Sequence, residues 1–110
     1  MEQAVLAITN LADVASAQKL ARTLVEQRLA ACVNMLPAVQ SIYRWNGAVE
    51  EAAEVTLLIK TTAARYAALE QAIQALHPYE LPEVIAVPVS AGLPAYLGWI
   101  EQETRKEIDV

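Results

Sequence analysis

The longest regular pattern in the chain lies between residues 30 and 61, where two extended segments flank the dipeptide Asn46-Gly47. Asn-Gly supplies the two positive φ angles that a type I′ turn requires, so the sequence predicts a β-hairpin with arms at residues 30–45 and 48–61. In the second arm, apolar and polar residues alternate with a period of two, which is typical of a strand with one buried face. The residues on that predicted buried face are Val55, Leu57, Ile59 and Thr61.

This predicted hairpin is long for the size of the chain. At about 3.3 Å per residue each arm extends roughly 45–50 Å, whereas a compact domain of this length has a radius of gyration of about 13 Å. Pro37 lies inside the first arm and cannot donate to a ladder, so it marks a bulge or an edge strand. Tyr43, Trp45 and Val49 near the tip need cover, and another copy of the chain is the simplest cover. We interpret the hairpin as an oligomerisation arm.

Before the hairpin, the sequence predicts a short strand and a helix. Residues 3–9 form an apolar run that suits a strand buried on both faces. Asn10 or Asp13 can cap the helix that follows, and the helix is expected to end near Arg28. Its apolar residues recur at i, i+3 and i+4, which indicates one buried stripe. The residues of that stripe are Ala17, Leu20, Ala21, Leu24, Val25 and Leu29.

After the hairpin, a second helix is expected at residues 63–76, with Thr61 or Thr62 as its cap. It must end near His77, because Pro78 disfavours the helical conformation of the residue before it. Its expected buried stripe is Tyr66, Leu69, Ile73 and Leu76.

The last two elements complete a recognisable order. Residues 84–89 form an apolar strand, and Pro94 begins a third helix, where its missing N–H group costs nothing. The order β-α-β-β-α-β, followed by a helix, predicts an α+β fold: a ferredoxin-like βαββαβ sandwich with a long central hairpin and an extra C-terminal helix. We expect a single domain over residues 1–110.

Composition narrows the possible partners. Eight Lys and Arg against 13 Asp and Glu give a net charge of −5, and there is no basic cluster, so we expect no nucleic-acid partner. No apolar run approaches the roughly 20 residues of a membrane span, and there is no signal-peptide pattern, so we expect no membrane partner. The single cysteine, Cys32, suits a reducing compartment, and cytoplasmic localisation is the expectation.

Cys32 and His77 are the candidate metal ligands, because soft and borderline ions such as copper and zinc favour thiolate and imidazole. A closed structural site needs four such ligands, so carboxylates or groups from a neighbouring subunit would have to complete it. The alternatives are that Cys32 is a small core residue and that His77 favourably ends a helix. Counting back from the turn places Lys60 opposite Val33, give or take a bulge, and Cys32 and Lys60 are then expected to be near-neighbours.

Two further chemistries are open at this point. His77, Tyr79, Glu80 and Lys60 could move protons if they shared a cleft, but no sequence motif requires it, and we expect no enzyme. Lys60 and Glu54 are equally compatible with solvated or ion-paired strand residues. Tyr43 and Trp45 could stack on bases or sugars. In an acidic chain, however, packing in a protein interface is the favoured interpretation of these two side chains.

Two sets of residues resemble the signature of the CutA divalent-cation tolerance family. The first set is Ala30-Ala31-Cys32-Val33-Asn34, Pro37, Ser41, Tyr43, Trp45, Gly47, Glu54 and Ile59-Lys60-Thr61. The second is the run from His77 to Glu83, then Pro88, Gly92, Tyr96-Leu97 and Trp99-Ile100. The resemblance covers roughly residues 5–101 and is highly specific.

The resemblance implies a ferredoxin-like homotrimer whose hairpins pair between subunits, with an architecture like that of the PII signalling proteins. It also implies a cytoplasmic, non-enzymatic protein that responds to metal ions. No cofactor is obligatory, and copper or another divalent cation is the ligand that the family suggests. The metal candidates are then His77, Cys32 and Glu80, and the candidates for an inter-subunit cleft are Lys60, Tyr79, Glu54, Trp45 and Trp99.

The chain departs from some relatives at two positions. Some members have a cysteine late in the first strand and a second histidine before His77, where this chain has Thr9 and Leu76. We therefore expect only a weak, partly aqueous site at His77 with Glu80 or Glu83. The alternative is a PII-like sensor or scaffold that holds an anionic metabolite against Lys60 and Tyr79 in the inter-subunit cleft.

Overall fold

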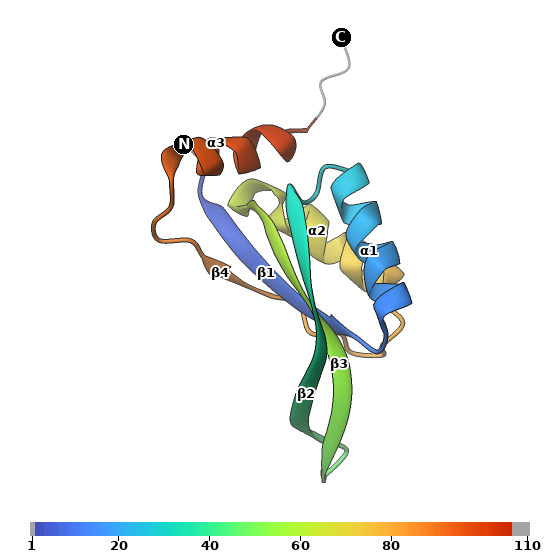
Figure 1. Cartoon of the computed structure of the whole chain (residues 1–110). Coiled ribbons are helices and arrows are strands. Elements are labelled where there is room, and N and C mark those ends of the chain that lie inside the picture. The colour runs from blue at the N-terminus through green and yellow to red at the C-terminus, as the bar shows by residue number, and fades with distance from the viewer. Residues whose placement is uncertain (1, 107–110) are drawn as a thin grey trace.

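The computed structural model describes residues 2–106, so Met1 and residues 107–110 of the predicted domain lie outside the described range. Its strands form one antiparallel sheet in the order β2-β3-β1-β4 (Figure 1). This is the predicted ferredoxin-like α+β fold with an added C-terminal helix. The elements are β1 (Ala4–Leu11), α1 (Val14–Glu26), β2 (Cys32–Trp45), β3 (Ala48–Thr62), α2 (Ala63–Leu76), β4 (Ile85–Pro88) and α3 (Pro94–Glu103).

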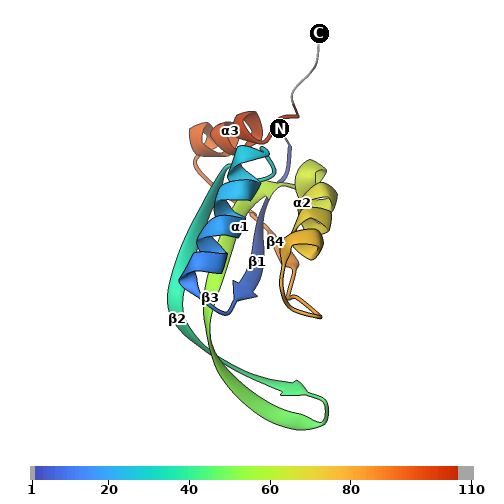
Figure 2. The same ribbon diagram turned by 90° about the vertical axis from the view of Figure 1, so that its right-hand side faces the viewer.

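The main core lies between the sheet and the two helices α1 and α2, which cover the same face of it (Figure 2). The predicted alternation in β3 is confirmed, because the residues of its predicted buried face are at most 4% exposed. Leu69 and Ile73 of α2 are buried as predicted, but Leu76 is 52% exposed. That part of the predicted stripe is wrong because the helix ends there and His77, the next residue, is the one that turns inward.

The hairpin of β2 and β3 extends beyond the other elements (Figures 1 and 2). With the hairpin included, the molecule measures 50 × 31 × 22 Å. Asn46 and Gly47 have φ angles of 50° and 79°, as the predicted turn requires. Near its tip, Ile42 is 68% and Val49 is 64% exposed. The described chain therefore leaves the tip uncovered, as the sequence predicts.

A β-bulge interrupts β2 at Pro37 and Ala38, between the paired residues Leu36 and Val39. Ala38 adopts a φ of 60°, and the hairpin bends along its length (Figure 2). The extra residue shifts the register by one position, so Lys60 lies opposite Cys32. The bulge moves the partner of Lys60 from Val33 to Cys32, which is within the allowance of the prediction, and the expected closeness of Cys32 and Lys60 is confirmed.

The third helix, α3, lies across one end of the sheet, near the start of β1 (Figure 1). Its buried residue Ile100 packs with Ala4 and Ala31 in a second, smaller core. Arg28 fastens the other end of the helix: its Nε donates to the Arg105 carbonyl at 3.0 Å and a terminal N–H donates to the Gln102 carbonyl at 2.8 Å. A cation is favourable at this position because the carbonyls at a helix C-terminus carry partial negative charge.

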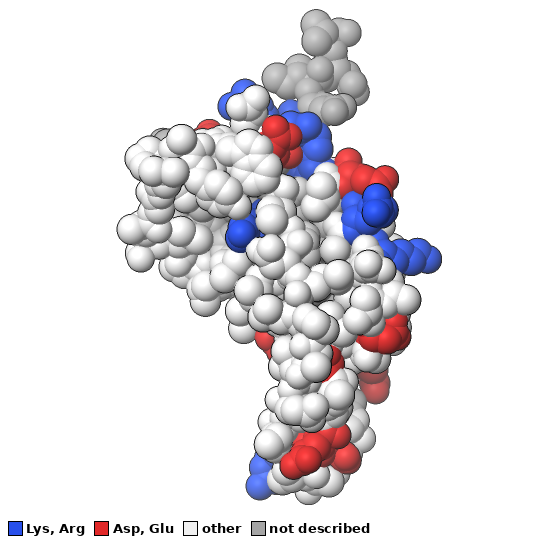
Figure 3. All heavy atoms as spheres, in the orientation of Figure 1, with Lys and Arg blue, Asp and Glu red and all other residues white. Residues whose placement is uncertain are grey.

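On the face of the sheet opposite α1 and α2, α3 covers only the end at Ala4 and Lys60. We call the remainder of this face the open face. Most of its central positions are apolar: Ile8 pairs with both Ile85 and Leu58, and Leu6 pairs with Val87 on one side and with Lys60 on the other. Figure 3 shows a mostly uncharged surface on this side, with one small basic patch within it and the other charged groups towards its margins and the hairpin tip. No helix within residues 2–106 is long and apolar enough to cross a bilayer.

Candidate functional site

A groove of about 870 Å³ lies between the hairpin and the loop that follows α2. We call it the hairpin groove, and we call residues 77–83 the proline loop, because Pro78 and Pro82 stiffen it. The groove is lined by Asn10 at the end of β1, by residues 41–43, 45 and 54 of the hairpin, and by residues 79–85.

His77 joins the proline loop to β1. The residue is 8% exposed, and its Nε2 lies 2.7 Å from the carbonyl oxygen of Asn10. Its Nδ1 accepts a hydrogen bond of 3.1 Å from the backbone N–H of Tyr79. A carbonyl only accepts and a backbone amide only donates, so these two contacts define the neutral imidazole with its hydrogen on Nε2.

Asn10 connects the loop to two strands. Its Nδ2 donates to Glu83 Oε1 at 2.7 Å, and its Oδ1 accepts from the Thr56 hydroxyl at 2.6 Å. With the His77 contact to its carbonyl, this one residue of β1 holds both ends of the proline loop and reaches β3. The wall of the groove is therefore positioned by hydrogen bonds before any ligand arrives.

Tyr79 fastens the middle of the loop to β3. Its hydroxyl donates to Glu54 Oε2 at 2.8 Å, and its ring lies edge-on to His77 with 4.6 Å between centroids. Burial is the main cause that raises the pKa of Tyr79 to about 12, and the neighbouring Glu54 carboxylate adds to it. Tyr79 is therefore a neutral hydrogen-bond donor at physiological pH.

The hairpin groove combines acidic and aromatic groups. Glu54, Glu80 and Glu83 line it, and no Lys or Arg does. Its hairpin side carries Tyr43 and Trp45, which are 44% and 39% exposed. Such a surface suits a cationic or apolar partner better than an anion.

The remaining predicted residues form a separate cluster beside α3. Lys60 donates to the Tyr96 hydroxyl at 3.3 Å and lies 5.5 Å from the centre of that ring, and Tyr96 packs against Trp99. Cys32, a partly buried free thiol, is the cross-strand neighbour of Lys60.

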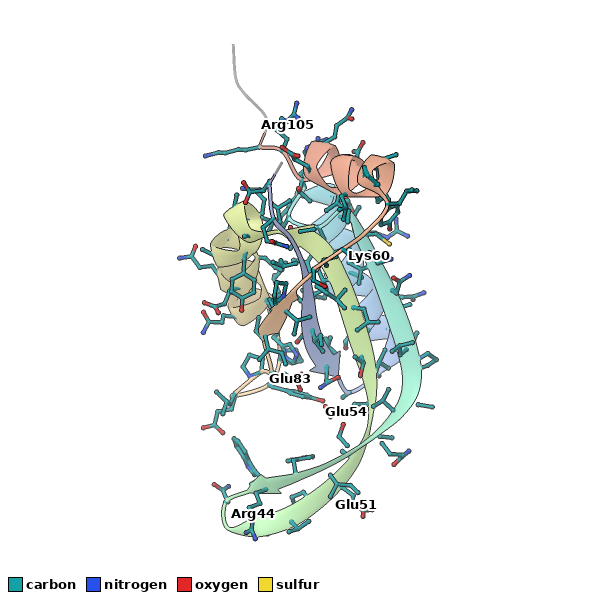
Figure 4. All side chains as sticks on the ribbon, turned by 90° about the vertical axis from the view of Figure 1, so that its left-hand side faces the viewer. Arg44, Glu51, Glu54, Lys60, Glu83 and Arg105 are labelled. Carbon is teal, nitrogen blue, oxygen red and sulfur yellow. The ribbon has the colours of Figure 1, made fainter. Side chains whose placement is uncertain are left out.

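These two clusters lie at different ends of the sheet. Lys60 pairs with Leu6, and Asn10 lies four residues further along β1, which is roughly 13 Å in an extended strand. Figure 4 likewise shows Lys60 well away from Glu54 and Glu83. Within one chain, the structure therefore brings neither Cys32 to His77 nor Lys60 to Tyr79, the two residues expected to receive an anionic metabolite in an inter-subunit cleft.

The donor groups of one chain do not fit a closed divalent-cation site. Within residues 2–106, no three His, Cys, Asp or Glu side chains are grouped closely enough to hold an ion together. At His77, Nε2 carries a hydrogen and the Nδ1 lone pair is taken by the amide of Tyr79. Glu80, the third predicted ligand, lies exposed on the groove.

The sequence predicts Asn10 only as a helix cap and indicates no site role for Thr56 or Tyr96. Asp13 is the actual cap, because its carboxylate accepts from the Ser16 N–H at 2.7 Å, which lowers the pKa of Asp13. The available signal for Asn10 was an amide at the end of an otherwise apolar strand. Nothing in the sequence indicated its three partners.

The fold and the hairpin groove place the chain among ferredoxin-like α+β proteins with an extended central hairpin. Comparison with known families is more specific, since the family described as "CutA1 divalent ion tolerance protein" matches residues 5–103. The chain belongs to this family.

Individual relatives agree with this assignment. The chain is 45% identical over 104 residues to the "Divalent-cation tolerance protein CutA" of Thermus thermophilus, covering 94% of this chain and 99% of that one. It is 50% identical over 88 residues to "Protein CutA" of Mus musculus, covering 80% of this chain and 50% of the mouse protein. It thus spans about half the length of the mouse protein and of the similar human protein.

Solved structures agree as well. The crystal structure of CutA from Xylella fastidiosa matches with a TM-score of 0.90 at 49% identity, covering 93% of this chain and 98% of that one. The crystal structure of CutA1 from Oryza sativa matches with a TM-score of 0.92 at 35% identity, covering 96% and 97% of the two chains.

Proposed function

We propose that this chain is a divalent-cation tolerance protein that works as a homotrimer without catalytic turnover and binds copper or other divalent cations weakly. The observation that carries the proposal is its membership of a family whose printed description is divalent ion tolerance. The bacterial relative that it matches over almost its whole length has the same description in its name.

The open face and the hairpin tip support the trimer. Both expose large apolar side chains, among them Ile42, Val49, Ile85 and Val87. Contiguous exposed apolar surface of this kind marks a protein interface in a protein that stays in solution. Further copies of the same chain would remove both surfaces from water.

Sedimentation equilibrium at micromolar protein concentration tests the oligomeric state. The expected mass is three times the 12.0 kDa of one chain. A well-folded particle of 12.0 kDa would contradict the proposed trimer.

Weak cation binding is proposed at the carboxylates of the hairpin groove, with Glu80 as the principal ligand and Glu83 beside it. An ion held by carboxylates and water is bound more weakly than one in a cage of imidazole and thiolate, because few protein ligands replace its hydration shell. The exposed position of Glu80 allows that hydrated coordination.

Calorimetric titration with Cu(II) and with Zn(II) tests this site. The Glu80→Gln variant should bind each ion less tightly than the wild type, whereas Glu26→Gln, which changes an exposed carboxylate on α1, should not. Equal isotherms for Glu80→Gln and the wild type would remove Glu80 as a ligand.

A reducing compartment, with the cytoplasm as the proposed location, is supported by the free thiol of Cys32. Among relatives, the proteins of Arabidopsis thaliana and Oryza sativa are named chloroplastic, and one solved relative from Archaeoglobus fulgidus is named periplasmic. Fractionation of the native host with an antibody to the chain tests the location.

A further inference from the structure

We infer that His77 is a positioning residue, held in one neutral tautomer to fasten the proline loop to β1, and that it is not a ligand of a divalent cation. The proposal concerns the groove of the proposed function and rests on it only for the choice of cation as the probe.

The first step is the occupancy of the ring nitrogens. Nε2 donates its hydrogen to the Asn10 carbonyl at 2.7 Å, and Nδ1 accepts from the Tyr79 amide at 3.1 Å. A metal-bound imidazole must present a free lone pair. The Nδ1 lone pair is already directed at a backbone N–H, and Nε2 has none to offer while it donates.

The second step is what coordination would displace. A cation at Nδ1 would leave the Tyr79 amide without its acceptor. A cation at Nε2 would displace the hydrogen on that nitrogen and leave the Asn10 carbonyl without its donor. An unpaired backbone group buried away from water is unfavourable. His77 as a residue is only 8% exposed and its ring is flanked by the ring of Tyr79, so a hydrated ion does not reach it without opening the loop.

The third step is the absence of further ligands close to the ring. Within residues 2–106, His77 belongs to no group of three His, Cys, Asp or Glu residues that could share an ion. Glu54 and Glu83, the two carboxylates tied into the same network, accept hydrogen bonds from Tyr79 and Asn10 respectively. The polar atoms around His77 are thus hydrogen-bonded to one another, and these bonds hold the wall of the groove in place.

The decisive experiment observes the imidazole directly. His77 is the only histidine in the sequence, so its ring nitrogens give the only imidazole signals in a long-range ¹H–¹⁵N spectrum of the untagged protein. We expect the pattern of the neutral Nε2–H tautomer, unchanged when equimolar Zn(II) is added. A different tautomer, or a saturable shift of either nitrogen with Zn(II), would overturn the proposal.

Variants test the positioning role. In His77→Ala the Tyr79 amide loses its acceptor, and we expect its hydrogen exchange to accelerate about tenfold. In His77→Asn the side-chain oxygen stands near the position of Nδ1, so much of that protection should return. Equal exchange rates in the wild type and in His77→Ala would contradict the role.

The two proposals fail separately. Zn(II) isotherms should be the same for the wild type and His77→Asn, which removes the imidazole but keeps an acceptor for the Tyr79 amide. A lower affinity in His77→Asn would overturn the inference while leaving weak cation binding intact. If the wild type bound no Zn(II) at all, the proposed groove site would fail, and the tautomer and exchange results would still decide the role of His77.

Discussion

Thr9 and Thr104 are both buried threonines, and they differ in whether the hydroxyl has a partner. The Thr104 hydroxyl donates to the Ile100 carbonyl at 2.8 Å. The Thr9 hydroxyl, on a residue that is 0% exposed, has no hydrogen-bond partner among the described residues. An unpaired buried hydroxyl is destabilising because it has given up water without replacement.

Thr9→Val should therefore increase the free energy of unfolding by about 1 kcal/mol, since valine has nearly the same shape and no hydroxyl. Urea denaturation at a fixed protein concentration measures this change in the free energy of unfolding. The matched control, Thr104→Val, removes a paired hydroxyl and should be destabilising. A loss of stability in Thr9→Val would indicate a partner for that hydroxyl, such as a bound water.

Tyr79 should make the protein sensitive to alkaline pH. Its pKa is raised from 10.0 to about 12, so the folded state holds the phenol proton where the unfolded chain has lost it. The stability from the neutral Tyr79 is thus fully present below pH 10 and is lost as pH rises from there towards about 12.

In Tyr79→Phe, the decline in the free energy of unfolding over that pH range should be shallower than in the wild type. Urea denaturation at several alkaline pH values measures the slope. A spectrophotometric titration of Tyr79→Phe should also show one phenol fewer than the wild type among those that ionise at the most alkaline pH. Identical slopes for the two proteins would mean that Tyr79 ionises at its ordinary pKa.

At the scale of elements, the position of α3 depends on Arg28. This residue has a φ of 58° just after α1, and its guanidinium bonds to two carbonyls at the C-terminal end of α3. Arg28→Ala should cost about 1–2 kcal/mol, because two charged hydrogen bonds are lost while the backbone strain stays the same.

Amide hydrogen exchange distinguishes this local role from general destabilisation. Exchange should accelerate in α3 more than in α1. Arg22→Ala, which truncates an exposed arginine on α1, should leave both helices unchanged. Uniform acceleration across the molecule in Arg28→Ala would argue against a specific clamp.

The elements also show where local pattern stops being sufficient. The Asn46-Gly47 turn and the alternation in β3 are local signals, and both are confirmed. The partner of Lys60 could be predicted only to within a bulge, because Pro37 signals a bulge without stating how many residues it adds. That single residue decides whether Cys32 or Val33 shares a row with Lys60.

For the whole molecule, the open face should control assembly. Val87 on β4 is 45% exposed and lies on the open face, and Val14 on α1 is 46% exposed and lies on the helical side. Val87→Lys should dissociate the proposed trimer, because a lysine would be buried in its interface without a partner. Val14→Lys should leave the trimer intact.

Sedimentation equilibrium, which gives the particle mass, and circular dichroism, which reports whether the chain is folded, together test this prediction. We expect a smaller particle with a native-like spectrum for Val87→Lys and the wild-type mass for Val14→Lys. If Val87→Lys sedimented at the wild-type mass, the open face would not be the interface, and the hairpin tip alone would carry the assembly.

The sequence by itself determined the elements, their order and the fold class, together with the exposed hairpin tip. These depend on turn chemistry, on periods of 2 and 3.6 residues and on proline, all of which act between residues near one another in the chain. It also brought His77, Tyr79 and Glu80 to notice as neighbours in one loop.

Only the tertiary structure decided what those residues do. His77 meets the Asn10 carbonyl across 67 positions of sequence, and Tyr79 meets Glu54 across 25. No local pattern encodes such contacts, because they arise where the end of β1, the hairpin and the proline loop pack together. The same packing separates Cys32 and Lys60 from His77, and it uses both imidazole nitrogens to hold the loop.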